Sequence, residues 1–319
     1  MMAVQFELGW QLDSAMPELW SEWERRLRAR SDPLSQAQAE RLRLHRDPEQ
    51  AAGSAARLRD LAERTGDAQI AGLWAQWACQ HGVAECRVAG DLWRALAPES
   101  LRAFLLRSVH PWPADAELRD WLARIPMSTG TEDPTGAMVR RLFDDDGAIG
   151  PGLRRATRST VLTELQAMLM GSEAVWLVKA CGRRSIPTVY RSLCEPAAEH
   201  LWRELRGSLL DESLILAAVR AFPERQPHWQ ARARAAEARR QWLETEHVAK
   251  AIEDAVLAPA CLTSSFVDDS LRLRFQLGEV GGIAAQMPKN PQAVKALSEA
   301  FRRRAKRSLL DLPPERAGS

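Results

Sequence analysis

Apolar residues recur at intervals of three and four positions along most of this 319-residue chain. One such stripe near the start consists of Leu19, Trp20, Trp23 and Leu27. This spacing places the side chains on a single face of a helix. Similar stripes follow one another, separated by short polar connections, and helices joined in this way usually stack as antiparallel hairpins. The sequence therefore predicts a mainly α fold, an irregular solenoid-like array of helical hairpins.

One segment near the C-terminus departs from the helical period. Its apolar residues alternate with polar ones, at Leu271, Leu273, Phe275 and Leu277. A period of two is typical of a half-buried strand. Residues 261–267 precede this segment and could supply a partner strand. We therefore expect one small β-hairpin over residues 261–278, followed by a basic helix over residues 291–310.

The long-range organisation follows from the breaks in the helical pattern. Segments rich in Gly, Pro, Ser, Thr and Asp occupy residues 126–136 and 144–152, and such segments rarely lie inside a helix or strand. We expect an N-terminal helical domain over residues 1–125, a linker region over 126–152 and a C-terminal helical domain over 153–319. Residues 228–257 lack both Gly and Pro, which predicts one long helix.

Composition excludes several classes of protein. A chain that is 45% hydrophobic and 27% charged is neither a wholly disordered chain nor a fibrous one. No stretch approaches 18 uninterrupted apolar residues, so we expect no membrane insertion. The five cysteines are thinly spread, and acidic residues interrupt the first twenty positions where a secretory signal would be apolar. These features predict a cytoplasmic protein with free thiols.

The basic residues and the aromatic residues are both unusual in kind. Of 44 Lys and Arg residues, five are lysines and the other 39 are arginines. Codon bias in a GC-rich bacterial genome explains this ratio, and arginine also suits bidentate binding of carboxylate or phosphate. There are twelve tryptophans and one tyrosine. Because tryptophan buries a large area, this number indicates either many contacts between helices or protein interfaces.

Three clusters of basic residues are the strongest signal of a binding site. The first, in the predicted C-terminal helix, consists of Lys295, Arg302, Arg303, Arg304, Lys306 and Arg307. The second, in the predicted long helix, consists of Arg232, Arg234, Arg239 and Arg240. The third follows a glycine-rich loop and consists of Arg154, Arg155 and Arg158. Such clusters can neutralise nucleic-acid phosphates or acidic protein surfaces, although a solvated helix face has the same composition.

The sequence indicates no metal site and no cofactor. Two loose sets of soft ligands occur, namely Cys79, His81 and Cys86, and then Cys181, Cys194 and His200. A structural zinc site needs four ligands, and a catalytic site needs three at characteristic spacings. Each set offers only three possible ligands, and their spacings match no common zinc motif. The carboxylates at 144–146 resemble the start of a calcium loop, but the twelfth position, which needs Glu, holds Arg155.

Catalytic signatures are also absent from the sequence. It contains no G-x-S-x-G elbow, no phosphate-binding loop of the G-x4-G-K-[ST] type and no H-E-x-x-H motif. We name no catalytic residue. The sequence favours a non-enzymatic α-helical scaffold or adaptor subunit of a bacterial multi-protein assembly, binding other protein subunits through Trp- and Arg-rich faces. One alternative is a helical subunit that contacts DNA or RNA through its C-terminal third. Another is a thiol- or metal-dependent enzyme.

Overall fold

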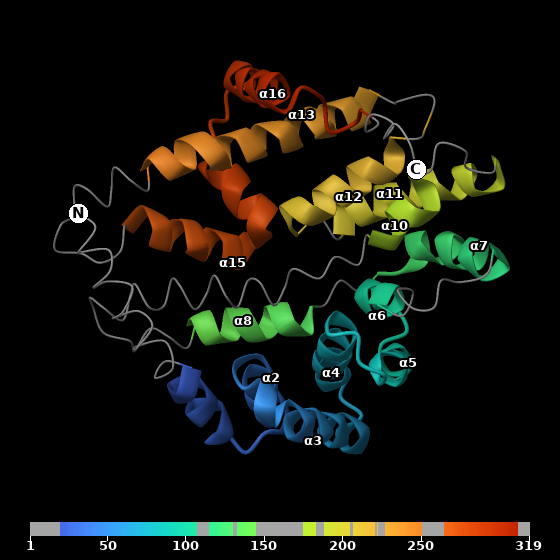
Figure 1. Cartoon of the computed structure of the whole chain (residues 1–319), viewed down its shortest axis with the longest axis vertical. Coiled ribbons are helices and arrows are strands. Elements are labelled where there is room, and N and C mark those ends of the chain that lie inside the picture. The colour runs from blue at the N-terminus through green and yellow to red at the C-terminus, as the bar shows by residue number, and fades with distance from the viewer. Residues whose placement is uncertain are drawn as a thin grey trace. The chain divides into compact units, whose positions relative to one another are not determined.

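The computed structural model describes residues 20–106, 115–129, 133–144, 175–182, 188–204, 207–220, 222, 227–250 and 265–311. Every regular element in these ranges is a helix, and none of them contains a strand (Figure 1). The mainly α prediction is confirmed. The chain divides into two compact units, each of which is assembled from separate stretches of the sequence.

Unit 1 contains most of the N-terminal half. After a helix at residues 20–28, its elements are α2 (Pro33–Arg46), η1 (Pro48–Gln50), α3 (Ala51–Thr65), α4 (Ala68–Gln80), α5 (Cys86–Leu96), α6 (Leu101–Leu106) and α8 (Pro134–Asp144). Local chemistry fixes several of their ends. The side chain of Asp32 caps α2 by accepting a hydrogen bond from the backbone N–H of Ser35 at 2.8 Å, and Asp67 caps α4 in the same way.

Helix α4 lies at the centre of unit 1, because it packs against α2, α3, α5, α6 and α8. Ile70, Leu73, Trp74 and Trp77 are all buried. Helix α8, which falls inside the predicted 126–152 linker, packs against α4 and buries Met138, Val139 and Leu142. Gly72 allows a close approach here: a Cβ atom at this position would lie 2.4 Å from Pro134 Cγ and 2.8 Å from Trp93 Cε2.

Unit 2 contains a short early segment and most of the C-terminal half. Its elements are α7 (Asp115–Arg124), η3 (Ile125–Met127), α10 (Val175–Cys181), α11 (Thr188–Glu204), α12 (Leu209–Val219), α13 (Pro227–Trp242), the π-helical turn η5 (Leu243–His247), most of α15 (Ser265–Gln286) and α16 (Pro291–Ala305). Ser208 and Asp211 form a reciprocal capping box at the start of α12. Asn290 caps α16, and Pro291 occupies its first turn.

The long helix predicted over residues 228–257 is present as far as the structure describes it. Helical backbone runs without a break through residues 227–250, from α13 through η5 and onward. Residues 251–257 lie outside the described part of the chain. Leu243–His247 form a π-helical turn, in which the backbone hydrogen bonds join residues five apart and not four.

The predicted β-hairpin over residues 261–278 is wrong. Residues 265–286 form helix α15, which is interrupted at Gly278, where the backbone has φ 75° and ψ 164°. The two halves of α15 come close, because a Cβ atom on Gly282 would lie 2.6 Å from the backbone nitrogen of Arg274. A strand needs a neighbouring strand to satisfy its backbone groups, and no strand occurs among the described residues. The segment satisfies these groups within its own helix instead. Residues 261–264 lie outside the described part.

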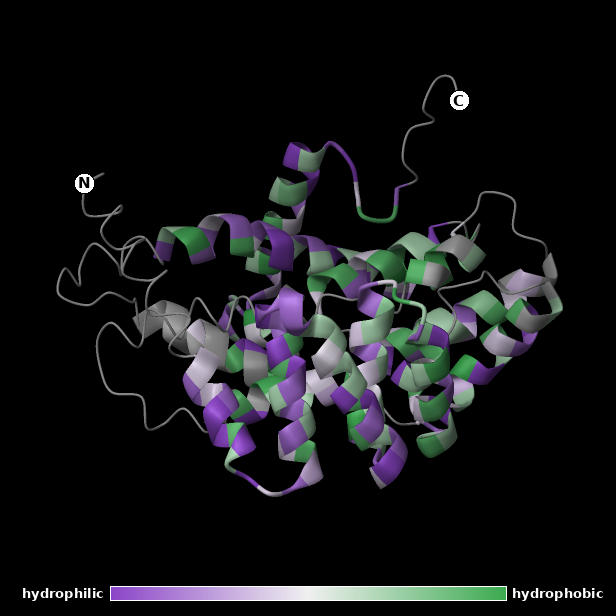
Figure 2. Cartoon of the chain, turned by 60° about the horizontal axis from the view of Figure 1, so that its bottom comes forward, coloured by the Kyte–Doolittle hydropathy of each residue, from purple (hydrophilic) through white to green (hydrophobic). Residues whose placement is uncertain are grey.

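The nine tryptophans whose side chains the structure describes belong to the protein's own core. In the described ranges, nine tryptophan side chains are each less than one-tenth exposed: Trp20, Trp23, Trp74, Trp77, Trp93, Trp121, Trp202, Trp229 and Trp242. Figure 2 shows apolar green and polar purple residues on opposite faces of many of the same helices. Of the two roles that the sequence left open for tryptophan, contacts between helices are the one these nine residues have.

Candidate functional site

The first predicted basic cluster lies on α16 and at its C-terminal end, and α16 packs against α13 (Figure 1). A buried carboxylate, Glu237 of α13, holds the two helices together. Its oxygens accept hydrogen bonds from Ser298 Oγ at 2.7 Å and from Arg302 Nε at 2.7 Å. They also accept bonds from Ser308 Oγ at 2.7 Å and from the backbone N–H of Leu309 at 2.9 Å. Arg302 therefore has a structural partner inside unit 2.

Two further members of this cluster are also paired. Arg304 forms an ion pair with Glu244 of η5. Lys295 Nζ lies 3.9 Å from Glu299 Oε1, one helical turn away. Pairing with these carboxylates neutralises part of the positive charge that the sequence places on α16.

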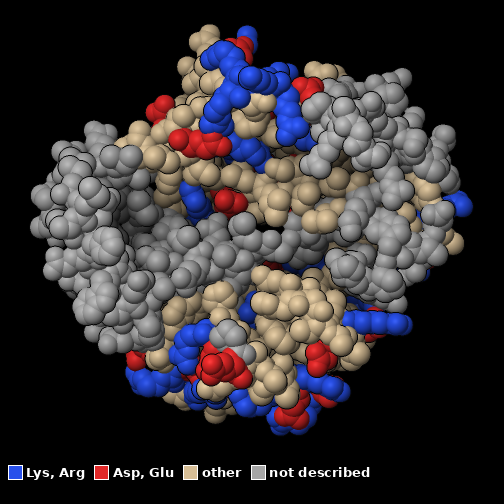
Figure 3. Space-filling view, in the orientation of Figure 1, with Lys and Arg blue, Asp and Glu red and all other residues tan. Residues whose placement is uncertain are grey.

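The other three members have exposed side chains and form no ion pair with any described residue. We call Arg303, Lys306 and Arg307 the basic tip. Lys306 ends α16 in the left-handed conformation, with φ 54°. In Figure 3, blue Lys and Arg side chains gather at the top of the view, where Figure 1 places α16. The basic tip is thus a group of cations held on a firmly anchored helix.

The second predicted cluster, on α13, is mostly structural. Arg239 is buried and forms a two-point ion pair with the fully buried Glu212 of α12. Arg240 donates hydrogen bonds to Leu209 O and Ser213 Oγ. Burial lowers the pKa of Arg240, and the neighbouring Glu212 opposes that shift.

The remaining two arginines of α13 differ from each other. Arg232 forms an ion pair with Glu199 Oε1 at 2.7 Å, and its guanidinium carbon lies 4.5 Å from the ring centre of Trp229. Arg234 is exposed and forms no ion pair with a described residue. The third predicted cluster, Arg154, Arg155 and Arg158, lies outside the described residues.

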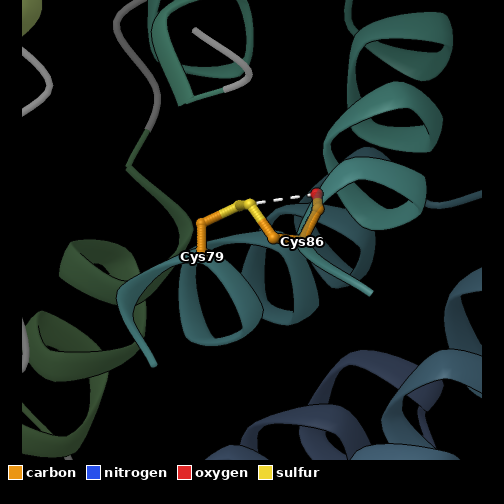
Figure 4. The surroundings of a disulfide bond; sticks show 2 residues. All are labelled: Cys79 and Cys86. Carbon is orange, nitrogen blue, oxygen red and sulfur yellow. Dashed lines mark hydrogen bonds between the residues drawn. A yellow bond between two sulfur atoms is a disulfide. The ribbon is translucent and has the colours of Figure 1, made fainter. Parts of the chain in front are cut away.

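The two sets of soft ligands are brought together as disulfides rather than as metal sites. Cys79 and Cys86 are bonded, with their Cα atoms 4.5 Å apart, and join the end of α4 to the start of α5 (Figure 4). Cys181 and Cys194 join α10 to α11 with a Cα separation of 5.8 Å. In the described part of the chain, no group of three His, Cys, Asp or Glu side chains could hold a metal ion.

The expectation of free thiols is therefore wrong for these four cysteines. Spacings of seven and thirteen residues along the chain do not reveal that the helix packing brings the thiols within bonding distance. A bonded sulfur has no thiolate to act as a nucleophile. Disulfides persist mainly in oxidising compartments, so the two bridges argue against the predicted reducing cytosol. Cys261 lies outside the described residues.

Sequence reasoning missed a network of charges in unit 1. Glu24 lies within 3.0 Å of Arg28, Arg43 and Arg46, and Glu40 binds Arg28 and Arg57. It also missed Arg41, a fully buried arginine of α2. Apart from the pair of Glu24 and Arg28, which lie one turn apart on the same helix, the partners come from other helices, and the sequence does not reveal them.

Comparison of the chain with models of protein families, with curated proteins and with solved structures finds no match. No helix in the described ranges is long and apolar enough to cross a membrane.

Proposed function

We propose that this chain is a non-enzymatic helical adaptor that binds an acidic protein partner through the basic tip of α16. The observation that carries the proposal is the difference between the basic tip and its neighbours. Arg302 and Arg304 are paired with Glu237 and Glu244, whereas the three tip residues are exposed without a described carboxylate. Charges of this kind contribute little to folding, but they steer and orient an acidic partner.

Anchoring of α16 supports this role. Four hydrogen bonds to the buried Glu237 fix both the helix and the turn that follows it. A fixed helix presents its charges with little loss of conformational entropy on binding. Since the nine described tryptophans are in the core, the surface that we propose rests on arginine and lysine rather than on the Trp-rich faces that the sequence suggested.

A nucleic acid is the second candidate partner, because phosphates need only such a cluster of unpaired cations. The experiment is affinity purification of the full chain from its native host, with and without nuclease treatment. We expect a partner that survives nuclease and is lost when Arg303, Lys306 and Arg307 are all changed to Gln. Loss of the partner on nuclease treatment would favour the nucleic-acid alternative.

A matched control removes the same charge elsewhere. Arg64, Arg87 and Arg124 are exposed, and each lies opposite an acidic residue one turn away on its own helix. Changing these three to Gln alters the net charge by the same amount and should leave the partner bound. If both triple variants release the partner equally, the net charge of the chain and not the basic tip governs binding, and the proposal is wrong.

A further inference from the structure

Arg41 of α2 is buried without a matching acceptor. Its side chain is 1% exposed. One nitrogen, Nη2, donates a long hydrogen bond of 3.4 Å to Gln80 Oε1 on α4. The other two nitrogens, Nε and Nη1, have no hydrogen-bond partner in the described part of the chain.

A guanidinium in this position remains charged. Burial lowers the pKa of Arg41 to about 10, which still lies well above neutral pH. A buried charge is costly to retain unless a counter-charge and hydrogen-bond acceptors compensate for the lost water. A negatively charged group that accepts hydrogen bonds from the unpaired N–H groups of Arg41 would therefore offset the cost of burying its charge.

The carboxylate of Asp133, which acts on Arg41 electrostatically, already has other partners. Its charge raises the pKa of Arg41, but its Oδ1 accepts hydrogen bonds from Gln76 Nε2 at 3.0 Å and from the N–H of Gly136 at 3.1 Å. Its Oδ2 lies 3.8 Å from Arg102 Nη2. Asp133 therefore accepts no hydrogen bond from Arg41, whose Nε and Nη1 have no partner among the described residues.

Two histidines lie near Arg41: His45 is four residues further along α2, and His81 follows Gln80, to which Arg41 donates its hydrogen bond. His45 is half-buried, and His81 is exposed at the end of α4. Burial lowers the pKa of both imidazoles, and the charge of Arg41 lowers them further. Each ring contacts a tryptophan, with centroid distances of 5.6 Å for Trp20 and His45 and 5.7 Å for Trp77 and His81.

The turn that carries His81 is constrained on both sides. Gly82 adopts the left-handed conformation with φ 64°, and the disulfide between Cys79 and Cys86 spans the turn (Figure 4). Cys79 Sγ lies 3.4 Å from the carbonyl oxygen of Cys86, the contact drawn as a dashed line in Figure 4. These two features constrain the backbone of the turn that carries His81.

We propose that Arg41, His45 and His81 form a binding site for a phosphate group, either free or carried as a monoester. A phosphate offers negative charge and several acceptor oxygens, which the two unpartnered nitrogens of Arg41 lack. Guanidinium binds phosphate with strong charge-assisted hydrogen bonds, and each imidazole can donate one more. The site lies in unit 1 and involves no residue of α16, so it does not depend on the proposed adaptor function.

The test is thermal unfolding and isothermal titration of the full chain with inorganic phosphate or O-phosphoserine, compared with chloride at equal ionic strength. We expect phosphate to raise the melting temperature of unit 1 by about 5 °C at a hundredfold excess over its dissociation constant. Chloride should have no such effect. The stronger of the two phosphate ligands identifies whether the free or the esterified group is preferred.

Arg41→Met should abolish the response to phosphate, and Arg64→Met, an exposed control in the same unit, should retain it. His45→Gln combined with His81→Gln tests the site without altering the buried charge, and should weaken phosphate binding about tenfold. Equal phosphate responses in wild type and Arg41→Met would overturn the proposal. So would a wild-type protein that responds to neither phosphate ligand beyond the chloride control.

Discussion

Helices α13 and α16 pack against each other, and both carry runs of basic residues, some of which are paired with carboxylates while others are exposed without such a partner among the described residues. On α13, Arg239 is buried against Glu212, and Arg240 bonds to groups of α12. On α16, the basic tip is exposed and faces no described carboxylate. The difference shows that an arginine becomes structural where a neighbouring helix places an acid opposite it. Substitutions of paired residues should therefore destabilise the fold more than substitutions of exposed, unpaired ones.

Glu212→Gln should have the largest effect, because it leaves the charge of the buried Arg239 uncompensated. Breaking a buried ion pair by removing one partner costs about 3–5 kcal/mol in the free energy of unfolding. Urea denaturation of the full chain measures this cost. Adding Arg239→Gln to the same chain should recover part of the loss, since the unpaired charge is then gone. A loss below about 1 kcal/mol for the single variant would mean that the pair contributes no more than a surface ion pair.

Glu237→Gln should have the next largest effect. The amide retains one acceptor oxygen but loses the charge that binds Arg302, and it cannot satisfy all four donors that meet at this position. We expect a loss of about 2–3 kcal/mol. Amide hydrogen exchange should accelerate most along α16 and the turn after it. Acceleration spread evenly over unit 2 would contradict the view that Glu237 anchors α16 in particular.

Arg232 and Arg234 provide a matched pair two residues apart on α13. Arg232 binds Glu199 and lies over Trp229 and Trp202, so Arg232→Gln should cost about 1–2 kcal/mol through the lost ion pair and the lost cation–π contacts. Arg234→Gln should change the free energy of unfolding by less than about 0.5 kcal/mol. Equal losses for the two variants would show that the ion pair and the tryptophan contacts of Arg232 do not stabilise the fold.

The helices themselves could be predicted from the sequence because the signal for a helix is local. The stripe of Ile70, Leu73, Trp74 and Trp77 lies within one helix, and the structure buries all four side chains. The prediction of a β-hairpin was wrong because it too rested on a local pattern. Four alternating residues are also a local pattern, and they do not reveal the break at Gly278 or the approach of Gly282 to the backbone of Arg274.

The sequence predicts the basic residues of the candidate site, but not which of them form ion pairs, because their carboxylate partners lie far away in the sequence. The sequence places Arg302 and Arg303 side by side, but Glu237, the partner of Arg302, lies 65 residues earlier. Glu212 and Arg239 are 27 residues apart. Composition therefore identifies a cluster of cations, and only the helix packing separates those that fold the chain from those left free to bind a partner.

A small effect on stability that depends on salt is expected when Arg303, Lys306 and Arg307 are changed together to Gln. These cations lie at the C-terminal end of α16, where they interact favourably with the helix dipole, each by a few tenths of a kcal/mol at low salt. The triple variant should therefore lose less than about 1 kcal/mol, and the loss should vanish in 1 M salt, where the Debye length is about 3 Å. The loss in Glu212→Gln should persist in the same salt, because ions do not screen a buried pair. Urea denaturation of both variants at low and high salt compares the two responses directly. A triple variant that stays destabilised in high salt would show that the basic tip is part of the folded core, and the distinction between the buried, paired arginines and the exposed basic tip would then fail.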